Sequence, residues 1–441
     1  MAVNNLPTAL QPIIQQGFLE REFMDALRSK LGYRAIADRQ SFSVGIGETL
    51  TKTRAGLKPS KTVPLAGASN TNLDNGLTPS NAGVEQYTIT LNHYADSIDL
   101  NMVTSRVGIA TQFLLNAKIN GEQAARSLDE LARAALFAPY FGGNTRIRTT
   151  LGAPGPVVSV DDVRGFQSVF VAGVLTATSN TNYVAVTIGS SVYNIGAVAV
   201  DGSNVSITPG GISGTLTTVS GNILVADGTA GNAAIASTAS VIVRPSARLT
   251  SSALTAADML TMANLLDAVA TLRLNNVPTI DGLFNAYVDP KSARQLFSDP
   301  DFKQLFQGVG ADNPTFRNGL ESEFLGLRLI TTNEAYVQAH PTLANTSIRR
   351  PIVCGQGALI EGDFDGIAHV DVVPADSIIS VVDGVAMVTR EPLDRLQQII
   401  AQSWYWIGGF TAPSDTTTNS TTLPTATNAN FKRAVMIEHI G

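Results

Sequence analysis

The chain has 441 residues, of which 15% are charged and 44% are hydrophobic, and its formal net charge is −6. This length allows about two or three domains with cores of their own, and the negative balance argues against a general nucleic-acid binder, which would carry a basic surplus. The single cysteine, Cys354, excludes an intramolecular disulfide framework. We expect no secretory signal peptide and no membrane span, because no apolar run approaches roughly 18 residues.

Residues 41–53, "SFSVGIGETLTKT", superficially look like a phosphate-binding loop. Such a loop needs a glycine directly before its lysine, whereas four residues separate Gly47 from Lys52. The apolar residues that alternate from Phe42 to Ile46 predict an extended strand instead. Nucleotide binding is therefore not expected here.

The next segment predicts a β-hairpin that projects from its domain. Residues 49–84 are polar and are often broken by Gly and Pro, and residues 86–100, "QYTITLNHYADSIDL", alternate again as a strand. A hairpin of this length cannot bury itself against its own domain, so we expect it to need a partner surface. An irregular surface loop is the alternative. The hairpin carries four cations before its first acidic residue: Lys52, Arg54, Lys58 and Lys61.

Residues 104–138 have the strongest helical pattern in the chain. No proline occurs between Pro79 and Pro139, and the segment would form a helix about 50 Å long. Acidic residues precede basic ones at i,i+4 spacing, in the pairs Glu122–Arg126 and Asp129–Arg133. One apolar stripe follows the helical period: Leu128, Leu131, Ala132, Ala135 and Leu136.

The composition changes abruptly after this helix. Between Gly165 and Val243 only Asp201 and Asp227 carry a charge. Short Val-, Ala-, Ile- and Thr-rich segments separated by turn signals predict a small antiparallel β domain. Its flanks, "GAPGPV" and "VRPSAR", read as linkers, so we expect an inserted domain.

Helical periodicity resumes after the insertion, with Thr255 as the expected N-cap ahead of Asp258. A strand "LFNAYVDP", a helix "KSARQLFSDPDFKQLF" and a strand "GLRLITT" follow. Residues 350–390 are rich in strand patterns. Two further strands, "SWYWIGGF" and "KRAVMIEHI", flank a Thr- and Asn-rich stretch at 411–430, and we expect these two strands to pair.

No set of residues in the sequence predicts catalysis or a metal site. The four histidines, His93, His340, His369 and His439, lack the spacing of a helical zinc pair. No G-x-S-x-G elbow occurs, and Cys354 lies among apolar neighbours, which favours a buried structural thiol. We therefore expect no enzyme activity and no cofactor.

One acidic cluster follows the cysteine and comprises Glu361, Asp363, Asp365 and Asp371. It lacks the remaining oxygen ligands of a calcium loop, so we expect a solvated turn between strands and keep a metal site as the alternative. Arg349 and Arg350 could pair with these carboxylates, or be solvated.

The order of these elements resembles a tailed-bacteriophage major capsid protein of the Hong Kong 97-like fold. "YTITLNHYADSIDLN" looks like the opening of one phage coat-protein family, and "NNVPTIDGLFNAYVDPKSARQLFSDPDFKQLF" with "GLESEFLGLRLITTNEA" looks like its axial-domain core. The resemblance covers roughly residues 40–150 and 250–440 and departs from this chain at the insertion. It implies an α+β fold with these parts: an N-terminal arm at 1–47, an extended β-hairpin loop at 48–90, a peripheral domain with a long spine helix at 91–156, the inserted antiparallel β domain at 157–248, an axial domain with return strands at 249–390, and C-terminal strands at 391–441.

The resemblance also implies a function. Such a chain would self-assemble as hexamers and pentamers of an icosahedral shell around double-stranded DNA, which it would contact without sequence preference. Scaffolding, portal and decoration proteins would be its partners, and it would be assembled in the bacterial cytoplasm and end in the virion. An encapsulin-like compartment shell and a β-rich bacterial surface protein are the alternatives.

The resemblance places the hairpin over a neighbouring subunit, near that subunit's spine helix. We therefore expect an intersubunit contact between the hairpin cations and carboxylates of that helix, unless the hairpin tip is simply solvated. The cations are Lys52, Arg54, Lys58 and Lys61, and the carboxylates are Glu122, Asp129 and Glu130.

Overall fold

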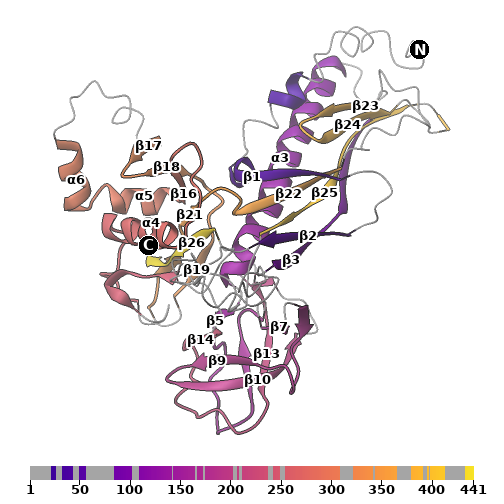
Figure 1. The fold of residues 1–441 in the computed structure, drawn as a ribbon. Helices are drawn as coiled ribbons and strands as arrows, with labels where there is room; N and C mark the ends of the chain where they lie inside the picture. The colour runs from indigo at the N-terminus through magenta and orange to yellow at the C-terminus, as the bar shows by residue number, and fades with distance from the viewer. Residues whose placement is uncertain are drawn as a thin grey trace, which may run out of the picture. The chain divides into compact units, whose positions relative to one another are not determined.

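The chain divides into two compact units (Figure 1). The first, here named the peripheral unit, combines Met1–Thr51, Thr88–Ala135 and Leu359–Thr411; the second combines Lys52–Tyr87, Leu136–Ala358 and Ala412–Gly441. The computed structural model describes residues 21–25, 32–42, 49–55, 84–101, 109–141, 143–163, 166–171, 174–201, 206–207, 211–236, 242–248, 254–307, 321–340, 343–364, 379–390, 395–396, 398–412 and 433–441.

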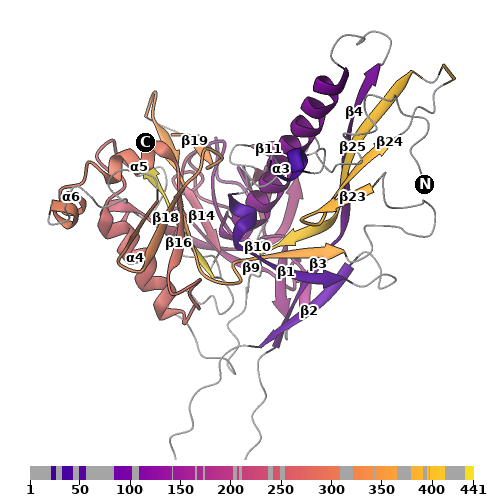
Figure 2. The ribbon, with the colours of Figure 1, turned by 90° about the horizontal axis from the view of Figure 1, so that it is seen from above.

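In the peripheral unit a mixed sheet lies beside one long helix (Figure 2). The strand order is β1-β22-β25-β24-β23, and β4 pairs with the other side of β25. β1 runs parallel to β22, whereas β25 is antiparallel to β22, β24 and β4. The strands are β1 (Ala37–Phe42), β4 (Asn92–Asn101), β22 (Leu359–Phe364), β23 (Ile379–Val382), β24 (Val385–Arg390) and β25 (Ile399–Thr411).

The long helix is α3, Ile109–Phe141, whose 33 residues span about 50 Å. It confirms the predicted helix. Its fully buried residues include Phe113 and Leu128, and they pack in one hydrophobic cluster with Ile400 and Trp406 of β25. The predicted apolar stripe faces the interior, since Leu128, Ala132 and Leu136 are all completely buried.

β2 (Thr49–Ala55) and β3 (Val84–Thr90) pair with each other in a two-stranded sheet, as the hairpin prediction requires. The tip between them lies outside the described residues, as do residues 413–432. The strand predicted over residues 41–53 is present as the end of β1 and the start of β2, on either side of an undescribed segment at 43–48. Residues 21–25, ahead of β1, are helical.

The inserted domain is a six-stranded antiparallel β-barrel. The strand order is β5-β14-β9-β10-β13-β6, and the first and last strands also meet. Ile147 bridges Val160, and the Arg148 N–H donates to the Ser159 carbonyl over 2.9 Å. Closure leaves this sheet with no unpaired edge. The strands are β5 (Asn144–Arg146), β6 (Val157–Val160), β9 (Val184–Ile188), β10 (Ser191–Val200), β13 (Gly214–Thr218) and β14 (Ala233–Ala236), with two small hairpins, β7–β8 (Ser168–Val171, Val174–Ala177) and β11–β12 (Ser206–Ile207, Gly211–Ile212).

The barrel interior is mostly aliphatic, with Val158, Val186, Ile188 and Leu216 among its buried residues, and it also contains Phe166. The barrel begins at β5, ahead of the domain boundary expected at residue 157. A three-residue strand is too short to show a period of two, so β5 could not be predicted from its residues. At the other end, β15 (Ile242–Val243) already pairs with a strand of the axial sheet.

The axial region of the second unit is a six-stranded sheet in the order β15-β26-β21-β16-β18-β17, with helices α4 to α6. All five residues of β16 are buried, Asn285 among them, as expected for a central strand that is rich in apolar residues. A small sheet β19-β20-β27 adjoins it. The elements are α4 (Met262–Leu274), β16 (Phe284–Val288), α5 (Pro290–Leu296), α6 (Pro300–Gln307), β17 (Glu321–Phe324), β18 (Leu327–Thr331), β19 (Val337–Ala339), β20 (Ser347–Arg349), β21 (Ile352–Cys354), β26 (Ala434–Ile437) and β27 (His439–Ile440).

The predicted start of α4 is wrong. The helix begins after Thr261, which forms a capping box with Asn264. Thr255 belongs instead to a turn in which the Asp258 carboxylate accepts its backbone N–H at 2.7 Å and its hydroxyl at 2.9 Å. Both threonines suit a cap, and only the tertiary contacts of Asp258 with Ser246 and Arg248 decide between them.

Two further predictions for this region are wrong. The single helix expected over "KSARQLFSDPDFKQLF" is two helices, because Pro300 cannot donate the hydrogen bond that would continue α5 and instead begins α6. The two C-terminal strands do not pair. β25 lies between β22, β24 and β4, whereas β26 lies between β15 and β21 in the other sheet. Both strands are apolar, and nothing in their own sequences specifies a partner.

Candidate functional site

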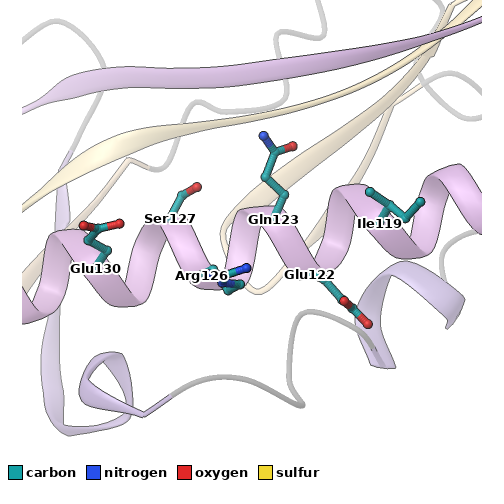
Figure 3. Close-up of a pocket in the computed structure, with 6 residues that line it drawn as sticks. All are labelled: Ile119, Glu122, Gln123, Arg126, Ser127 and Glu130. Atoms are coloured by element: carbon teal, nitrogen blue, oxygen red, sulfur yellow. The ribbon is translucent and has the colours of Figure 1, made fainter. Parts of the chain in front are cut away.

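A shallow groove of about 320 Å³ follows one side of α3 (Figure 3). Gln123 is fixed at this groove, because its amide donates to Asp96 of β4 and its carbonyl accepts from the Trp404 indole. The Glu130 side chain is 70% exposed and pairs with Arg133 at 3.2 Å. The groove is lined by Ile119, Glu122, Gln123, Arg126, Ser127 and Glu130. It therefore offers solvent-accessible carboxylates to a partner.

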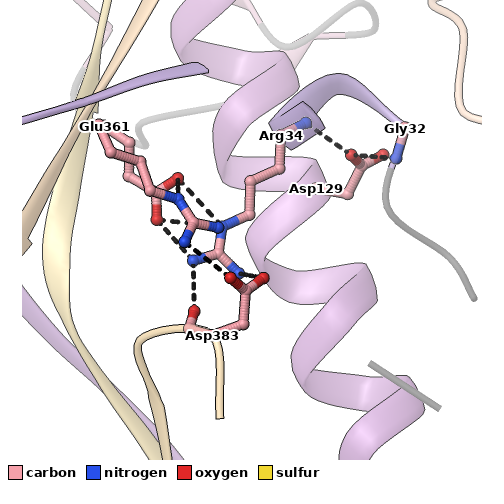
Figure 4. A network of polar contacts seen from close by, with 6 residues as sticks. Gly32, Arg34, Asp129, Glu361 and Asp383 are labelled. Atoms are coloured by element: carbon pink, nitrogen blue, oxygen red, sulfur yellow. Dashed lines mark hydrogen bonds and ion pairs between the residues drawn. The ribbon is translucent and has the colours of Figure 1, made fainter. Parts of the chain in front are cut away.

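Asp129, the third predicted carboxylate, is not part of this surface. Only 3% of the surface of Asp129 is exposed. One of its carboxylate oxygens accepts hydrogen bonds from the backbone N–H groups of Gly32 and Arg34, at 3.0 and 3.1 Å (Figure 4). Burial raises the pKa of Asp129, and these hydrogen bonds oppose that shift. Asp129 thus differs from Glu122 and Glu130, because one of its carboxylate oxygens holds the segment of the same chain that precedes β1.

The same N-terminal segment is held by a buried ion pair. Both Arg34 and Glu361 are almost fully buried, and the guanidinium contacts both carboxylate oxygens at 2.5 to 3.1 Å. Arg34 also donates to the Asp383 carbonyl (Figure 4). Arg39 pairs with the Asp383 carboxylate at 2.7 Å. The solvated turn predicted around Glu361 is therefore wrong for this residue, which lies within β22. Asp363 is half-buried at the end of β22, and Asp365 and Asp371 lie outside the described residues.

Of the predicted cations, Lys52 lies on β2 and is half-buried. The Arg54 side chain, Lys58 and Lys61 lie outside what the structure describes. The described residues therefore include one side of the expected contact, the α3 carboxylates, and not the other.

In the axial region, Arg349 and Arg350 do not pair with the acidic cluster that begins at Glu361. Arg350 pairs with Glu438 at 2.9 Å, and Arg244 pairs with the other oxygen of the same carboxylate at 2.8 Å. Burial alone would raise the pKa of Glu438, but the two guanidinium groups outweigh it and lower the pKa to about 2. Arg349 pairs with Asp289, which also caps α5.

One constellation in this region was missed by the sequence reasoning. The Ser292 hydroxyl lies 2.7 Å from His439 Nε2 and also contacts the Asp289 carboxylate. The carboxylate does not orient the imidazole, because His439 Nδ1 lies 2.9 Å from the Ile440 carbonyl. Ser292 and His439 are completely buried, so the hydroxyl has no approach for a substrate. No short motif links residues that are 147 positions apart.

Cys354 is a free, fully buried thiol, as predicted, and burial raises its pKa. Within the described ranges no three His, Cys, Asp or Glu residues gather as they would around a metal ion. No described helix combines the length and apolar character needed to cross a membrane.

No protein-family model and no curated protein matches the sequence. Solved structures do match it. The capsid of Ralstonia phage GP4 has a TM-score of 0.50 and 10% sequence identity, and the match covers 94% of this chain and 90% of that chain. This chain has a phage capsid fold. The fold predicted from the resemblance is thereby confirmed.

Two further capsid structures match with lower TM-scores. The capsid of cyanophage P-SCSP1u has a TM-score of 0.44 and 11% sequence identity, and the match covers 91% of this chain and 86% of that chain. The capsid asymmetric unit of cyanophage Pam1 has a TM-score of 0.44 and 11% sequence identity, and the match covers 94% of this chain and 92% of that chain.

Proposed function

We propose that this chain is the major capsid protein of a tailed bacteriophage and assembles into the icosahedral shell that encloses a double-stranded DNA genome. The observation that carries the proposal is the likeness to the capsid of Ralstonia phage GP4 along 94% of the chain. The paired β2–β3 hairpin and the long α3 are the parts that the sequence resemblance required. The chain acts by assembly, and we expect no turnover of a substrate.

The chain would build hexamers and pentamers, and scaffolding, portal and decoration proteins would be its partners. It would be assembled in the host cytoplasm and remain in the virion. Its net charge of −6 supports a loose, sequence-independent contact with packaged DNA, because tight binding would need a basic surplus.

Within this proposal, the groove on α3 is the surface that receives the hairpin of a neighbouring subunit. Glu122 and Glu130 line the groove, and the hairpin carries Lys52, Arg54, Lys58 and Lys61. Asp129 is removed from the contact because it is buried and already bonded to backbone N–H groups. Each exposed pair would contribute only about 0.2–1 kcal/mol, but a shell repeats the contact many times.

Electron microscopy of particles purified after expression, together with an assay for nuclease-resistant DNA in particles from infected cells, tests this function. We expect closed shells of uniform size, and DNA inside those from infection. A chain that stays monomeric when it is expressed with its viral neighbours would contradict the proposal. Shells that hold protein cargo and no DNA would favour the compartment alternative.

A further inference from the structure

The strand β4 has one edge that no described strand covers. β4 lies beside β25 and pairs with it along one side (Figure 2), and among the residues that the structure describes no strand pairs with its other side. At ten residues it is the longest edge strand of the described sheets. Proteins keep exposed edges short or cover them, because a row of unpaired N–H and C=O groups is a template for another strand. The exposed residues of β4 are Asn92, His93, Ala95, Asp96, Ser97 and Asp99.

Two hydrogen bonds of Asp96 define this edge. One carboxylate oxygen accepts the Ser97 N–H at 2.8 Å, which directs that N–H away from β25. In an antiparallel sheet, alternate residues direct their N–H and C=O groups to the same side, so Ala95 and Asp99 share the open edge with Ser97. The other Asp96 oxygen accepts from Gln123, which lines the groove on α3 (Figure 3). The Asp96 carboxylate therefore lies where the open edge of β4 meets the groove.

The charge at this edge decides which strand can pair with it. A second β4 would bring its own Asp96, and β3 carries Glu85, so both would place like charges together. β2 carries no acidic residue, and it carries Lys52 and Arg54 two positions apart, the spacing that places strand residues on one face. Of the strands of the hairpin, β2 is thus the one whose charge complements the edge.

β2 also has a free edge of its own. It pairs with β3, and in the described part of the chain its other side has no partner strand. β3 and β4 follow each other with only Leu91 between them, so a β2 that lies beside β3 does not also lie along the β4 of its own chain. The seven residues of β2 extend over about 23 Å and fit within the roughly 33 Å of β4. The strand that meets β4 therefore comes from another copy.

We propose that β2 of a neighbouring copy adds to the open edge of β4 as a further strand of the peripheral sheet. Its cations take the place beside Asp96, and the Ser97 N–H then pairs with the backbone of the added strand. The proposal rests on the proposed function, because it specifies how one subunit holds the hairpin of the next. Backbone hydrogen bonds hold the strand, and the carboxylate beside the groove sets which strand is accepted.

Disulfide crosslinking identifies the occupant of the edge. Ala95→Cys is combined in turn with a cysteine at the positions of β2 that alternate with its cations, Thr49, Thr51 and Thr53. The native thiol, Cys354, is buried and does not compete. One of these three chains should form covalent multimers on mild oxidation of assembled protein, because paired strands bring two cysteines within disulfide reach.

Val381→Cys, combined with the same β2 variants, is the matched control. Val381 lies in the same cross-strand row as Ala95, through Ala386 and Tyr405, and it is 44% exposed on β23 at another edge of the sheet. We expect about tenfold less crosslinking for this control. Closed shells in which no Ala95→Cys combination exceeds the control would overturn the strand addition and leave the capsid function standing. Multimers above the control without shells would support the strand addition and contradict the capsid function.

Exchange of charge tests the role of Asp96. Asp96→Lys places like charges at the contact and should lower the particle yield about tenfold, and adding Lys52→Glu to the same chain should restore it to within about threefold. Asp99→Lys is the control, because Asp99 is exposed and, three positions away, lies on the other face of β4; its yield should stay within about twofold. A yield that Asp96→Lys leaves unchanged, or that Lys52→Glu does not restore, would overturn the assignment of β2 to this edge.

Discussion

The peripheral unit and the inserted barrel differ in how far apart in the chain their contacting residues lie. In the peripheral unit the buried ion pair joins Arg34 to Glu361, which are 327 positions apart. In the barrel, every strand pairs with another strand within residues 144–236. The peripheral sheet also takes its strands from three distant stretches of the chain. The barrel closes on itself, and the Ala236 N–H donates to the Gly143 carbonyl at 2.6 Å, so its two ends lie side by side. The barrel is thus a local structure set into a non-local one.

This difference has consequences for folding and for tolerance to change. Contacts between distant segments form only after a long loop has closed, whereas local antiparallel pairing does not wait for the rest of the chain. We therefore expect the barrel to fold by itself, and the peripheral unit to depend on the order in which its segments meet. The following experiments test this contrast, from the largest expected effect to the smallest.

The position of a deletion should decide whether the protein stays soluble. Removing residues 144–235 and joining the ends with a short glycine linker takes out the whole barrel, and we expect soluble chain that still forms shells. Removing residues 165–243, the charge-poor stretch alone, leaves β5 and β6 with no barrel strand to pair with except each other and takes β15 from the axial sheet. Exposed strand edges aggregate, so this chain should be insoluble. The measurement is soluble yield and particle formation, and equal outcomes would refute the autonomous barrel.

Breaking the buried ion pair should strongly destabilise the peripheral unit. Glu361→Gln leaves the Arg34 guanidinium without its main partner, which should lower the free energy of unfolding by about 3–5 kcal/mol. Urea unfolding followed by tryptophan fluorescence reports on this unit, because both tryptophans of the chain, Trp404 and Trp406, lie in β25. Glu323→Gln is the control, since its pair with Arg328 is exposed and should contribute no more than about 1 kcal/mol.

The contrast between local and non-local structure also explains what could be predicted from sequence. α3 and the turn-rich barrel were found because periodicity and turn residues are local signals, and β16 was found because four of its five residues, all but Asn285, are apolar. The Arg34–Glu361 pair, the Ser292–His439 contact and the separate partners of β25 and β26 were not found. Each depends on residues far apart in the chain, and a charged or polar residue does not reveal whether tertiary structure will bury it.

The axial region has a non-local contact whose effect should depend on pH. Burial lowers the pKa of His439 to about 4, from an ordinary 6.5. Between these values the unfolded chain binds a proton that the folded chain does not, so stability should fall as the pH drops from 6.5 through 4, on the order of a few kcal/mol. His439→Gln should flatten this dependence, measured as hydrogen exchange of β20. His93→Gln, on the exposed face of β4, should leave it unchanged.

Asp129 distinguishes a structural anchor from an assembly contact. Asp129→Asn keeps an oxygen that can accept from Gly32 and Arg34, so we expect a small loss of stability, below about 1 kcal/mol, whereas Asp129→Ala should cost about 1–3 kcal/mol. Both are measured by urea unfolding of the unassembled chain. If Asp129→Asn instead folds normally and abolishes assembly, the carboxylate charge has a role between subunits that its burial argues against.

The smallest effect on the single chain is expected at the hairpin tip, where reversing charge should act on assembly alone. In the proposed contact, Lys58→Glu with Lys61→Glu would put two acids opposite the groove that Glu122 and Glu130 line. The unassembled chain lacks the neighbour that would supply these pairs, so its unfolding free energy should change by less than about 1 kcal/mol. The lost pairs act together in a shell, so particle formation should fail or become strongly dependent on salt. Adding Glu122→Lys and Glu130→Lys to the same chain should restore particles, because opposite charges again face each other. Normal shells from the hairpin variant at both low and high salt would mean that the tip is solvated and that the groove on α3 receives another part of the neighbouring subunit.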